Sequence, residues 1–225
     1  MTLKQAGIIL ATAVLLASFF WLGTNVKDQK IVIPCKPKQP EHKPTITEEE
    51  TTVIVNGVGL FDNTSNGEIV HIIITSKRGE GRVFADFSTG AYVGTDLQES
   101  ILLARLVASE YTGELAFDKD YFVTFDSEAT EVSGSSGTAG IAAGFVALAE
   151  GKRVKQNVAV SGFVYENQTI GEVERIGDKT RVAEKAGMTS MIIPAVQCNK
   201  TMMENFTIEV ICAHDLSDVI DNLLE

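Results

Sequence analysis

Apolar and polar residues alternate along much of the chain in patterns that predict both strands and helices. Residues 51–58 and 68–76 are rich in Val and Ile and are separated by a polar sequence, which predicts two strands joined by a turn. Apolar residues recur at helical spacing in the segment that ends at Gly113, and Thr95 or Asp96 can cap this helix. The other predicted strands lie at 81–87, 121–127, 157–164, 189–194 and 206–212. Three further helices are predicted. One follows the loop 132–138 and runs through Ala149, one spans 178–186, and the last begins near Asp215 or Ser217.

The order of these elements indicates the fold class. Strands and helices alternate without a regular strand–helix–strand rhythm, and the sequence has no long internal repeat. The pattern therefore predicts an α+β or mixed α/β domain over residues 51–225.

Residues 6–23 form a run of 18 residues without a charge. At about 1.5 Å per residue this run spans ~27 Å as a helix, close to the ~30 Å of bilayer hydrocarbon. A cleaved signal peptide has a shorter apolar stretch that ends in a small-residue cleavage site, whereas Ala11 and Ala13 lie in the middle of this run. We therefore expect an uncleaved single-pass transmembrane anchor, preceded by a short tail at residues 1–5, rather than a removed signal.

Residues 24–50 differ in character from the segments on either side. They carry four of the five prolines of the chain, among Lys, Gln and Glu. Such a composition favours extended conformations and predicts a semi-rigid tether between anchor and domain. A proline-rich binding motif is the alternative interpretation.

Two signals bear on which side of the membrane the domain occupies. More lysines follow the apolar run than precede it, which by positive-inside counting favours a cytoplasmic domain. Large domains, however, cross membranes largely regardless of nearby charge. Four N-x-[ST] sequons fit export, and we expect an extracytoplasmic domain. The sequons begin at Asn63, Asn167, Asn199 and Asn205.

Composition excludes several classes of function. The chain has 19 basic and 30 acidic residues, a net charge of −11, so we expect no nucleic-acid partner. Three cysteines are too few and too scattered for a disulfide framework or a zinc site. At most one pair can form a disulfide, and Cys198 and Cys212 are the two that lie nearest each other in the sequence. With only three histidines as well, we expect no metal.

The loop SGSSGTAG at residues 133–140 has three interpretations. A glycine-rich loop at a helix N-terminus can cradle a phosphate, but the pattern G-x-x-x-x-G-K-[ST] occurs nowhere in the chain. Small residues also permit close packing where a strand turns into a helix. Finally, a serine at a helix N-terminus can act as a nucleophile, because backbone N–H groups there stabilise an oxyanion.

A serine nucleophile needs a base that takes its proton. His42 lies in the tether, His71 lies inside a predicted strand, and His214 flanks the final helix without a local signature. A lysine can serve instead where an apolar site lowers its pKa enough to leave it neutral.

Four segments together resemble the Lon protease proteolytic domain. They are VSGSS at 132–136, VAVSG at 158–162, TIGEVERIGDK at 169–179 and AEKAGMTSMIIP at 183–194. The chain is most similar to archaeal membrane or secreted Lon-like serine peptidases that lack the ATPase module. The likeness is strongest over residues 121–194, and it implies an α+β fold in which helices pack on a mixed sheet.

The resemblance implies a Ser/Lys dyad in which Ser136 attacks the peptide carbonyl and Lys179 acts as general base and then general acid. The separations of Ser136 from Ser161 and Lys179, 25 and 43 residues, match ordinary Lon domains without a gap. Thr138 is the alternative nucleophile, because Thr-Ala-Gly echoes the Ser-Ala-Gly of the family. That choice requires a two-residue deletion inside the following helix.

Further roles follow from the same resemblance. Ser161 matches the threonine that hydrogen-bonds near the lysine in the family, and backbone N–H groups around Gly134, Ser135 and Ser136 are candidates for the oxyanion hole. No cofactor is implied. The expected partners are a polypeptide substrate and the membrane. Because members of the family often form rings, the resemblance also allows a homo-oligomer.

The chain departs from the family pattern at several positions. Ser135 replaces the usual Pro before the nucleophile, Gly137 and Thr138 replace Ala-Gly after it, and Glu174 and Arg175 replace Gly-Gly before the lysine. We expect a membrane-anchored, ATP-independent serine endopeptidase that acts on unfolded polypeptides. The alternatives are a catalytically degenerate Lon-like domain that binds peptides or scaffolds a membrane complex, and an anchored domain whose glycine-rich loop serves packing alone.

Overall fold

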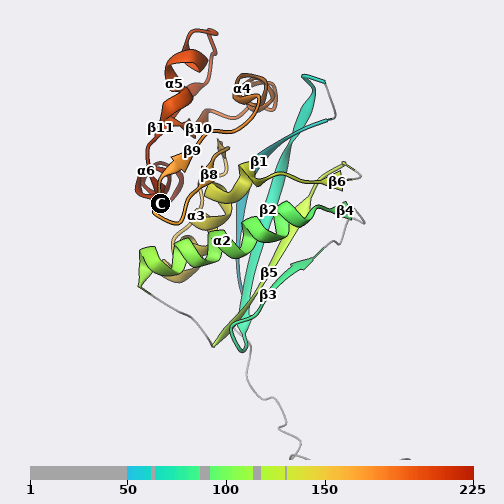
Figure 1. Cartoon of the computed structure of the whole chain (residues 1–225), viewed down its shortest axis with the longest axis vertical. Helices are drawn as coiled ribbons and strands as arrows, with labels where there is room; N and C mark the ends of the chain where they lie inside the picture. Colours follow the sequence, from blue (N-terminus) through green and yellow to red (C-terminus); the bar gives the residue numbers. More distant parts are fainter. Residues whose placement is uncertain (1–49, 62–63, 87–91, 114–117, 130) are drawn as a thin grey trace, which may run out of the picture. The chain divides into compact units, whose positions relative to one another are not determined.

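The computed structural model describes residues 50–61, 64–86, 92–113, 118–129 and 131–225 (Figure 1). The predicted tail, transmembrane anchor and nearly all of the tether lie outside the described residues. Within the described ranges, no helix has both the length and the apolar character needed to cross a bilayer. The described residues, from 50 to 225, belong to one structural unit.

A seven-stranded mixed sheet forms the centre of the domain, with the strand order β11-β10-β7-β1-β2-β5-β3. The two long central strands, β1 and β2, pair antiparallel, and β5 pairs antiparallel with β2. All other neighbours in the sheet are parallel. The bounds are β1 (Thr51–Leu60), β2 (Gly67–Arg78), β3 (Val83–Asp86), β5 (Lys119–Asp126), β7 (Val158–Val160), β10 (Ser190–Pro194) and β11 (Glu209–Ala213).

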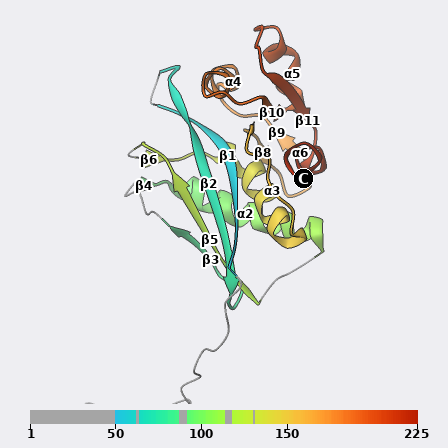
Figure 2. The ribbon, with the colours of Figure 1, turned by 180° about the vertical axis from the view of Figure 1, so that it is seen from behind.

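Five α-helices pack on this sheet in the described part of the chain, so the fold is mixed α/β. In the views from the two sides, α2 and α3 lie on one face of β1, β2 and β5 (Figures 1 and 2). The bounds are α2 (Thr95–Thr112), α3 (Thr138–Glu150), α4 (Ile176–Lys185), α5 (Ala195–Met202) and α6 (Leu216–Leu223). Two short strand pairs complete the fold, namely β4 (Tyr92–Val93) with β6 (Glu131–Val132), and β8 (Phe163–Val164) with β9 (Ile170–Gly171).

The small residues of α3 allow the helix to lie very close to the sheet. A Cβ atom on Gly140 would come 2.7 Å from Val160, and one on Gly144 would come 2.5 Å from Ile74. The packing interpretation of the small-residue segment is therefore correct for α3 itself. Eleven of the thirteen residues of α3 are buried, which makes it the central helix of the larger apolar core.

Each face of β1 contributes to a different apolar core. Val53 and Val55 belong to the core under α2, α3 and α6, and Val58 belongs to a second core that includes residues of α4, α5 and β10. Successive side chains of a strand point to opposite faces, so residues 53 and 55 lie opposite residue 58. Two of the helices that carry candidate site residues, α3 and α4, thus pack on different faces of the same strand.

Several predicted boundaries differ from the structure. The single strand predicted at 157–164 is divided into β7 and β8, because the N–H of Gly162 leaves the sheet and bonds the carbonyl of Ser136. Helix α2 begins at Thr95 with Gly94 as its N-cap and without a side-chain cap, so the prediction that Thr95 or Asp96 caps it is wrong. Helix α4 begins two residues earlier than predicted. Helix α6 begins at Leu216, close to the predicted start, and Asp215 caps it by accepting a hydrogen bond from the N–H of Asp218.

Helix α5 was not predicted, and a disulfide fixes it to the neighbouring strand. Cys198 in α5 bridges Cys212 in β11, with a Cα–Cα distance of 5.8 Å. Cys198 is buried in the second core. The pair that the sequence allowed is therefore joined, and the bridge links α5 to the edge strand of the sheet.

Candidate active site

The glycine-rich loop turns sharply between β6 and α3. Gly134 has a φ of 95°, a value that L side chains rarely adopt, and a single 3₁₀ turn at Ser135–Gly137 then leads into α3. Ser136 lies in this turn, half-buried. The loop thus presents a serine hydroxyl at the N-terminal end of a helix.

Lys179 comes from α4 and meets this serine. Its Nζ atom lies 2.6 Å from the Oγ of Ser136 and 3.4 Å from the Oγ of Ser161. The lysine side chain is almost entirely enclosed, with 7% exposed. The structure therefore brings together three of the residues that the sequence singled out.

Thr138 has a different environment. It is fully buried at the start of α3, and its hydroxyl donates a hydrogen bond to the carbonyl of Ser135. This bond stabilises the turn into the helix. The geometry therefore favours Ser136 over Thr138 as the hydroxyl that meets the lysine.

The segment after β7 holds the serine loop from the sheet side. The N–H of Gly162 donates to the carbonyl of Ser136 at 2.8 Å, and the N–H of Ala139 donates to the carbonyl of Gly162 at 3.1 Å. The Ser161 hydroxyl also lies 3.4 Å from the Ser136 carbonyl. These contacts fix the backbone of Ser136 relative to the strand that carries Ser161.

Burial lowers the pKa of Lys179 to about 8. Two exposed neighbours modify this effect in opposite directions, since the Glu174 carboxylate raises the pKa and the Arg175 guanidinium lowers it. With a pKa of about 8, roughly one lysine in ten is uncharged at pH 7, compared with fewer than one in a thousand at the ordinary pKa. The site therefore supplies a usable fraction of neutral amine.

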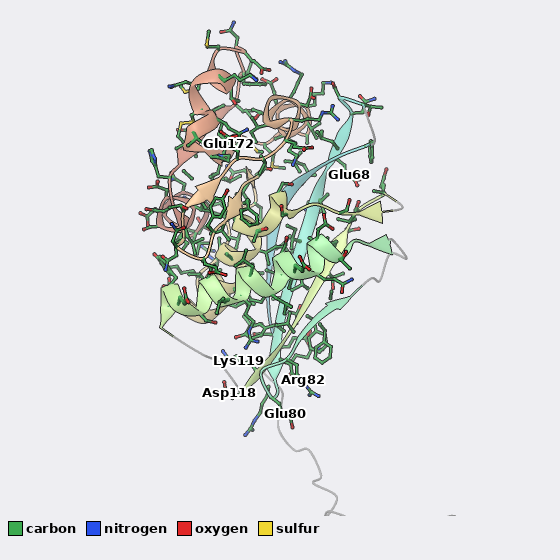
Figure 3. All side chains as sticks on the ribbon, in the orientation of Figure 1. Glu68, Glu80, Arg82, Asp118, Lys119 and Glu172 are labelled. Atoms are coloured by element: carbon green, nitrogen blue, oxygen red, sulfur yellow. A yellow bond between two sulfur atoms is a disulfide. The ribbon has the colours of Figure 1, made fainter. Side chains whose placement is uncertain are left out.

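The pair lies in the wall of an open cleft of about 810 Å³. That size is within the range of ligand-binding clefts. Glu68 and Glu172 also line it, and Figure 3 shows both in the half of the domain opposite to Arg82. The cleft is lined by parts of β1 and β2, the loops around Ser127 and Ser133, and the segment from Glu172 to Arg175.

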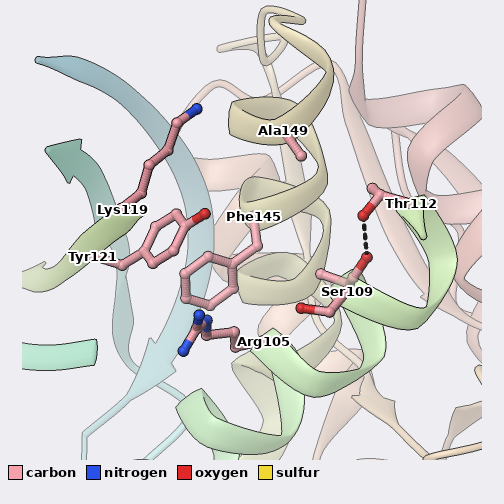
Figure 4. A pocket seen from close by; sticks show the side chains of 8 residues that line it. Arg105, Ser109, Thr112, Lys119, Tyr121, Phe145 and Ala149 are labelled. Atoms are coloured by element: carbon pink, nitrogen blue, oxygen red, sulfur yellow. Dashed lines mark hydrogen bonds between the residues drawn. The ribbon is translucent and has the colours of Figure 1, made fainter. Parts of the chain in front are cut away.

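A second hollow between α2, α3 and β5 is much smaller. Its volume is about 20 Å³, enough for about one water molecule (Figure 4). The guanidinium of Arg105 lies 5.2 Å from the centre of the Tyr121 ring and donates to the carbonyl of Gly81. This hollow is too small for a peptide, whereas the larger cleft has room for one.

Two contacts around the cleft were not foreseen from the sequence. Asp96 accepts a hydrogen bond from the N–H of Gly134 at 2.6 Å, so this N–H is directed to a carboxylate. The first turn of a helix leaves its N–H groups without an intrahelical acceptor, and Ser135 and Ser136 are therefore the remaining candidates for an oxyanion hole. On the opposite wall, the amide of Gln197 bonds both the N–H and the carbonyl of Val173.

Arg175, immediately before α4, adopts a left-handed backbone conformation with φ 55° and ψ 38°. The family pattern has glycine here, for which this conformation carries no strain. Its guanidinium donates to Asp178 at 2.8 and 3.0 Å and to the carbonyl of Thr64 at 2.5 Å. The arginine thus links the start of the lysine helix to the turn between β1 and β2.

Comparison with known proteins agrees with this architecture. Residues 36–225 match the Lon protease (S16) C-terminal proteolytic domain. The chain is 26% identical over 195 residues to the archaeal Lon protease of Archaeoglobus fulgidus, covering 84% of this chain and 31% of that protein. It is 27% identical over 179 residues to the peroxisomal Lon protease homolog 2 of Arabidopsis thaliana, covering 75% of this chain and 20% of that protein.

A human relative gives the same result over a shorter segment. The chain is 32% identical over 125 residues to the mitochondrial Lon protease homolog of Homo sapiens, covering 53% of this chain and 13% of that protein. The chain therefore spans less than a third of the length of these relatives. Because the domain match covers most of its residues, the chain belongs to the Lon protease C-terminal proteolytic domain family.

Proposed function

We propose that this chain is a membrane-anchored, ATP-independent serine endopeptidase in which Ser136 and Lys179 form the catalytic dyad. The observation that carries the proposal is the 2.6 Å contact between the enclosed Lys179 amine and the Ser136 hydroxyl, at the wall of an open cleft. Serine–amine contact at this distance is within reach of direct proton transfer.

The reaction follows from the positions of these groups. Neutral Lys179 accepts the proton of Ser136 as its Oγ bonds to the carbonyl carbon of the scissile peptide. The resulting oxyanion accepts hydrogen bonds from the N–H groups of Ser135 and Ser136. The C–N bond then breaks, and the ammonium of Lys179 gives its proton to the leaving amine, which leaves an acyl ester on Ser136.

The second half of the reaction reverses these roles. A water molecule gives a proton to Lys179 as its oxygen bonds to the ester carbonyl carbon. Collapse of this intermediate breaks the ester bond, and the proton returns from the lysine to Ser136. The products are a new carboxyl terminus and a new amino terminus. Ser161, 3.4 Å from the amine, holds Lys179 in place through both halves.

Unfolded polypeptides are the proposed substrates. The scissile bond must reach a serine in the wall of a cleft, and a chain held in a folded domain cannot extend into it. The proton transfers above use no nucleotide, and the 225 residues contain no G-x-x-x-x-G-K-[ST] sequence. Hydrolysis of an unfolded substrate is therefore proposed to proceed without ATP.

Anchoring and export complete the proposal. The uncharged run at residues 6–23 is long enough to span a bilayer. The disulfide between Cys198 and Cys212 supports an oxidising compartment, where such bonds persist. Three sequon asparagines, Asn167, Asn199 and Asn205, are exposed and accessible to glycosylation. A glycan on any of them would support export, and labelling of the domain only from the cytoplasmic side would contradict it.

The decisive experiment incubates the full chain with an unfolded protein in the absence of nucleotide and metal. Ser136→Ala and Lys179→Ala are expected to abolish cleavage, whereas Lys155→Ala should cleave normally, because the Lys155 amine bonds a carbonyl at a different place, on Asn222. Cleavage that survives Ser136→Ala but not Thr138→Ala would move the nucleophile to Thr138. Peptide binding without cleavage by any variant would favour the catalytically degenerate binding module.

A further inference from the structure

Asp96 connects the first turn of α2 to the serine loop, although 38 residues separate it from Gly134. One carboxylate oxygen, Oδ2, accepts the N–H of Gly134 at 2.6 Å. The other, Oδ1, accepts the N–H of Leu97 at 2.9 Å. Both oxygens of the carboxylate are thus fixed by backbone donors, and the side chain has a defined orientation at the cleft wall.

The backbone on both sides of this contact is shaped to permit it. A Cβ atom on Gly94 would come 2.4 Å from the Oδ1 of Asp96 and 3.1 Å from the side chain of Ser133. Gly134 has a φ of 95°, which a residue with a side chain adopts only with strain, although a Cβ there would meet no atom within 4 Å. The N–H of Gly94 also bonds the carbonyl of Val132, so the two segments are joined next to the carboxylate. A side chain at either glycine would disturb the contact.

The contact has a consequence for the nucleophile. A hydrogen bond to a carboxylate is shorter and stronger than one between neutral groups. It fixes the Ser133–Gly134 peptide, and therefore the point from which the chain enters the turn that carries the next two N–H groups. We propose that Asp96 is a positioning residue, which acts through Gly134 to hold the Ser136 hydroxyl and the oxyanion-hole N–H groups toward the cleft. This inference rests on the proposed function.

An electrostatic role for Asp96 is the competing explanation. A carboxylate near the site could act on the charge of Lys179 instead of on the loop. The charged groups that act on the pKa of the lysine are Glu174 and Arg175. A positioning residue changes the rate at every pH, whereas a charge partner of the lysine moves the midpoint of the pH profile.

The test compares Asp96→Ala, Asp96→Asn and Asp218→Ala in the full chain, with a fluorogenic unfolded protein as substrate. Asp218 is a matched control, because it also lies in the first turn of a helix and accepts a backbone N–H, that of His214, at 2.7 Å. Asp96→Ala should lower kcat about 10- to 100-fold with KM changed less than about threefold. Asp96→Asn keeps a carbonyl acceptor and should recover most of this loss, and Asp218→Ala should keep the parental kcat.

A second measurement does not depend on turnover. Hydrogen exchange of the peptide that covers residues 132–138 should be faster in Asp96→Ala than in the parent and unchanged in Asp218→Ala. Unchanged exchange, a kcat within twofold of the parent, or a shifted midpoint of the pH profile in Asp96→Asn would each overturn the inference. If the parent cleaves no better than Ser136→Ala, the proposed function fails, and the exchange result still decides whether Asp96 holds the loop.

Discussion

The side-chain amide of Gln197 forms two hydrogen bonds with the backbone of Val173, accepting its N–H at 3.0 Å and donating to its carbonyl at 2.8 Å. Gln197 lies in α5, next to the disulfide-bonded Cys198, and Val173 lines the cleft. The disulfide-bonded helix α5 is thus connected to the wall of the cleft.

Gln197→Ala is expected to loosen this wall. Loss of the two hydrogen bonds should lower the free energy of unfolding by about 1–3 kcal/mol and raise KM more than it lowers kcat. Gln156→Ala is the control, since the Gln156 amide also makes two backbone hydrogen bonds, to the carbonyls of Ile54 and Val154. Equal effects of the two substitutions on KM would contradict a specific role for Gln197.

The disulfide should contribute measurably to stability. A bridge that closes a loop of about 15 residues is worth about 3 kcal/mol in the chain-entropy account, and Cys198 and Cys212 are 14 residues apart. In denaturant unfolding, reduction of the disulfide should lower the free energy of unfolding of the parent by this amount. A variant with both cysteines replaced by Ala should unfold at the same midpoint with and without reductant. The same midpoint with and without reductant in the parent would show that the bridge contributes nothing.

Gly144→Ala tests the close approach of α3 to the sheet. The new Cβ would come 2.5 Å from Ile74 at a buried position of the helix, and overpacking of this kind costs about 1–3 kcal/mol. Gly137→Ala is the control, because its Cβ would meet only Ile72, at 3.7 Å, and its φ of −90° suits any residue. Thermal unfolding should show a lower Tm for Gly144→Ala alone.

Lys179→Met should stabilise the domain while abolishing cleavage. The pKa of Lys179 is about 8 in the folded chain and 10.5 as its ordinary value. The unfolded chain therefore binds more protons between these values, and stability rises with pH from about 8 to about 10.5. Burial of the charged amine below pH 8 destabilises the parent, so Lys179→Met should gain about 1–3 kcal/mol at pH 7. Denaturant midpoints should show this advantage shrinking at pH 10.5, and an advantage independent of pH would contradict the explanation.

Glu174 and Arg175 should shift the pH dependence of cleavage in opposite directions. Burial is the main cause of the lowered pKa of Lys179, but Glu174 raises this pKa and Arg175 lowers it. The base must be neutral, so activity falls as the pH drops through the pKa. Glu174→Gln should move this limb of the kcat/KM profile to lower pH, and Arg175→Gln should move it to higher pH. Shifts in the same direction would show that the two charges do not act on the lysine.

The sequence predicted the central elements because their signals are local. The Val- and Ile-rich runs of β1 and β2 and the periodic apolar positions of α2 each report on a few neighbouring residues. The division between β7 and β8 is different, since it depends on a bond from Gly162 to Ser136 that no local pattern records. Helix α5 was missed for a related reason, because its AVQCNKTM sequence is only eight residues long and is held by the disulfide and by Gln197.

In the candidate site, too, contacts between residues far apart in the sequence were harder to predict than local features. The spacing of Ser136, Ser161 and Lys179 could be compared with a family, and the structure brings these three side chains together. Asp96 could not be found this way, because its polar side chain at the start of a helix also fits an ordinary cap. The contact between α2 and the loop before α3 forms only when the domain has packed, so no local sequence pattern reveals it.

A direct measurement of the ionisation of Lys179 tests the central claim. In the full chain labelled with ¹³C at lysine Cε, the Lys179 signal can be assigned by its absence from Lys179→Met and followed by NMR from pH 6 to pH 11. We predict a titration midpoint near pH 8 for this lysine. A midpoint near the ordinary lysine value of 10.5 would mean a charged, hydrated amine that cannot take the proton of Ser136, and would contradict the account.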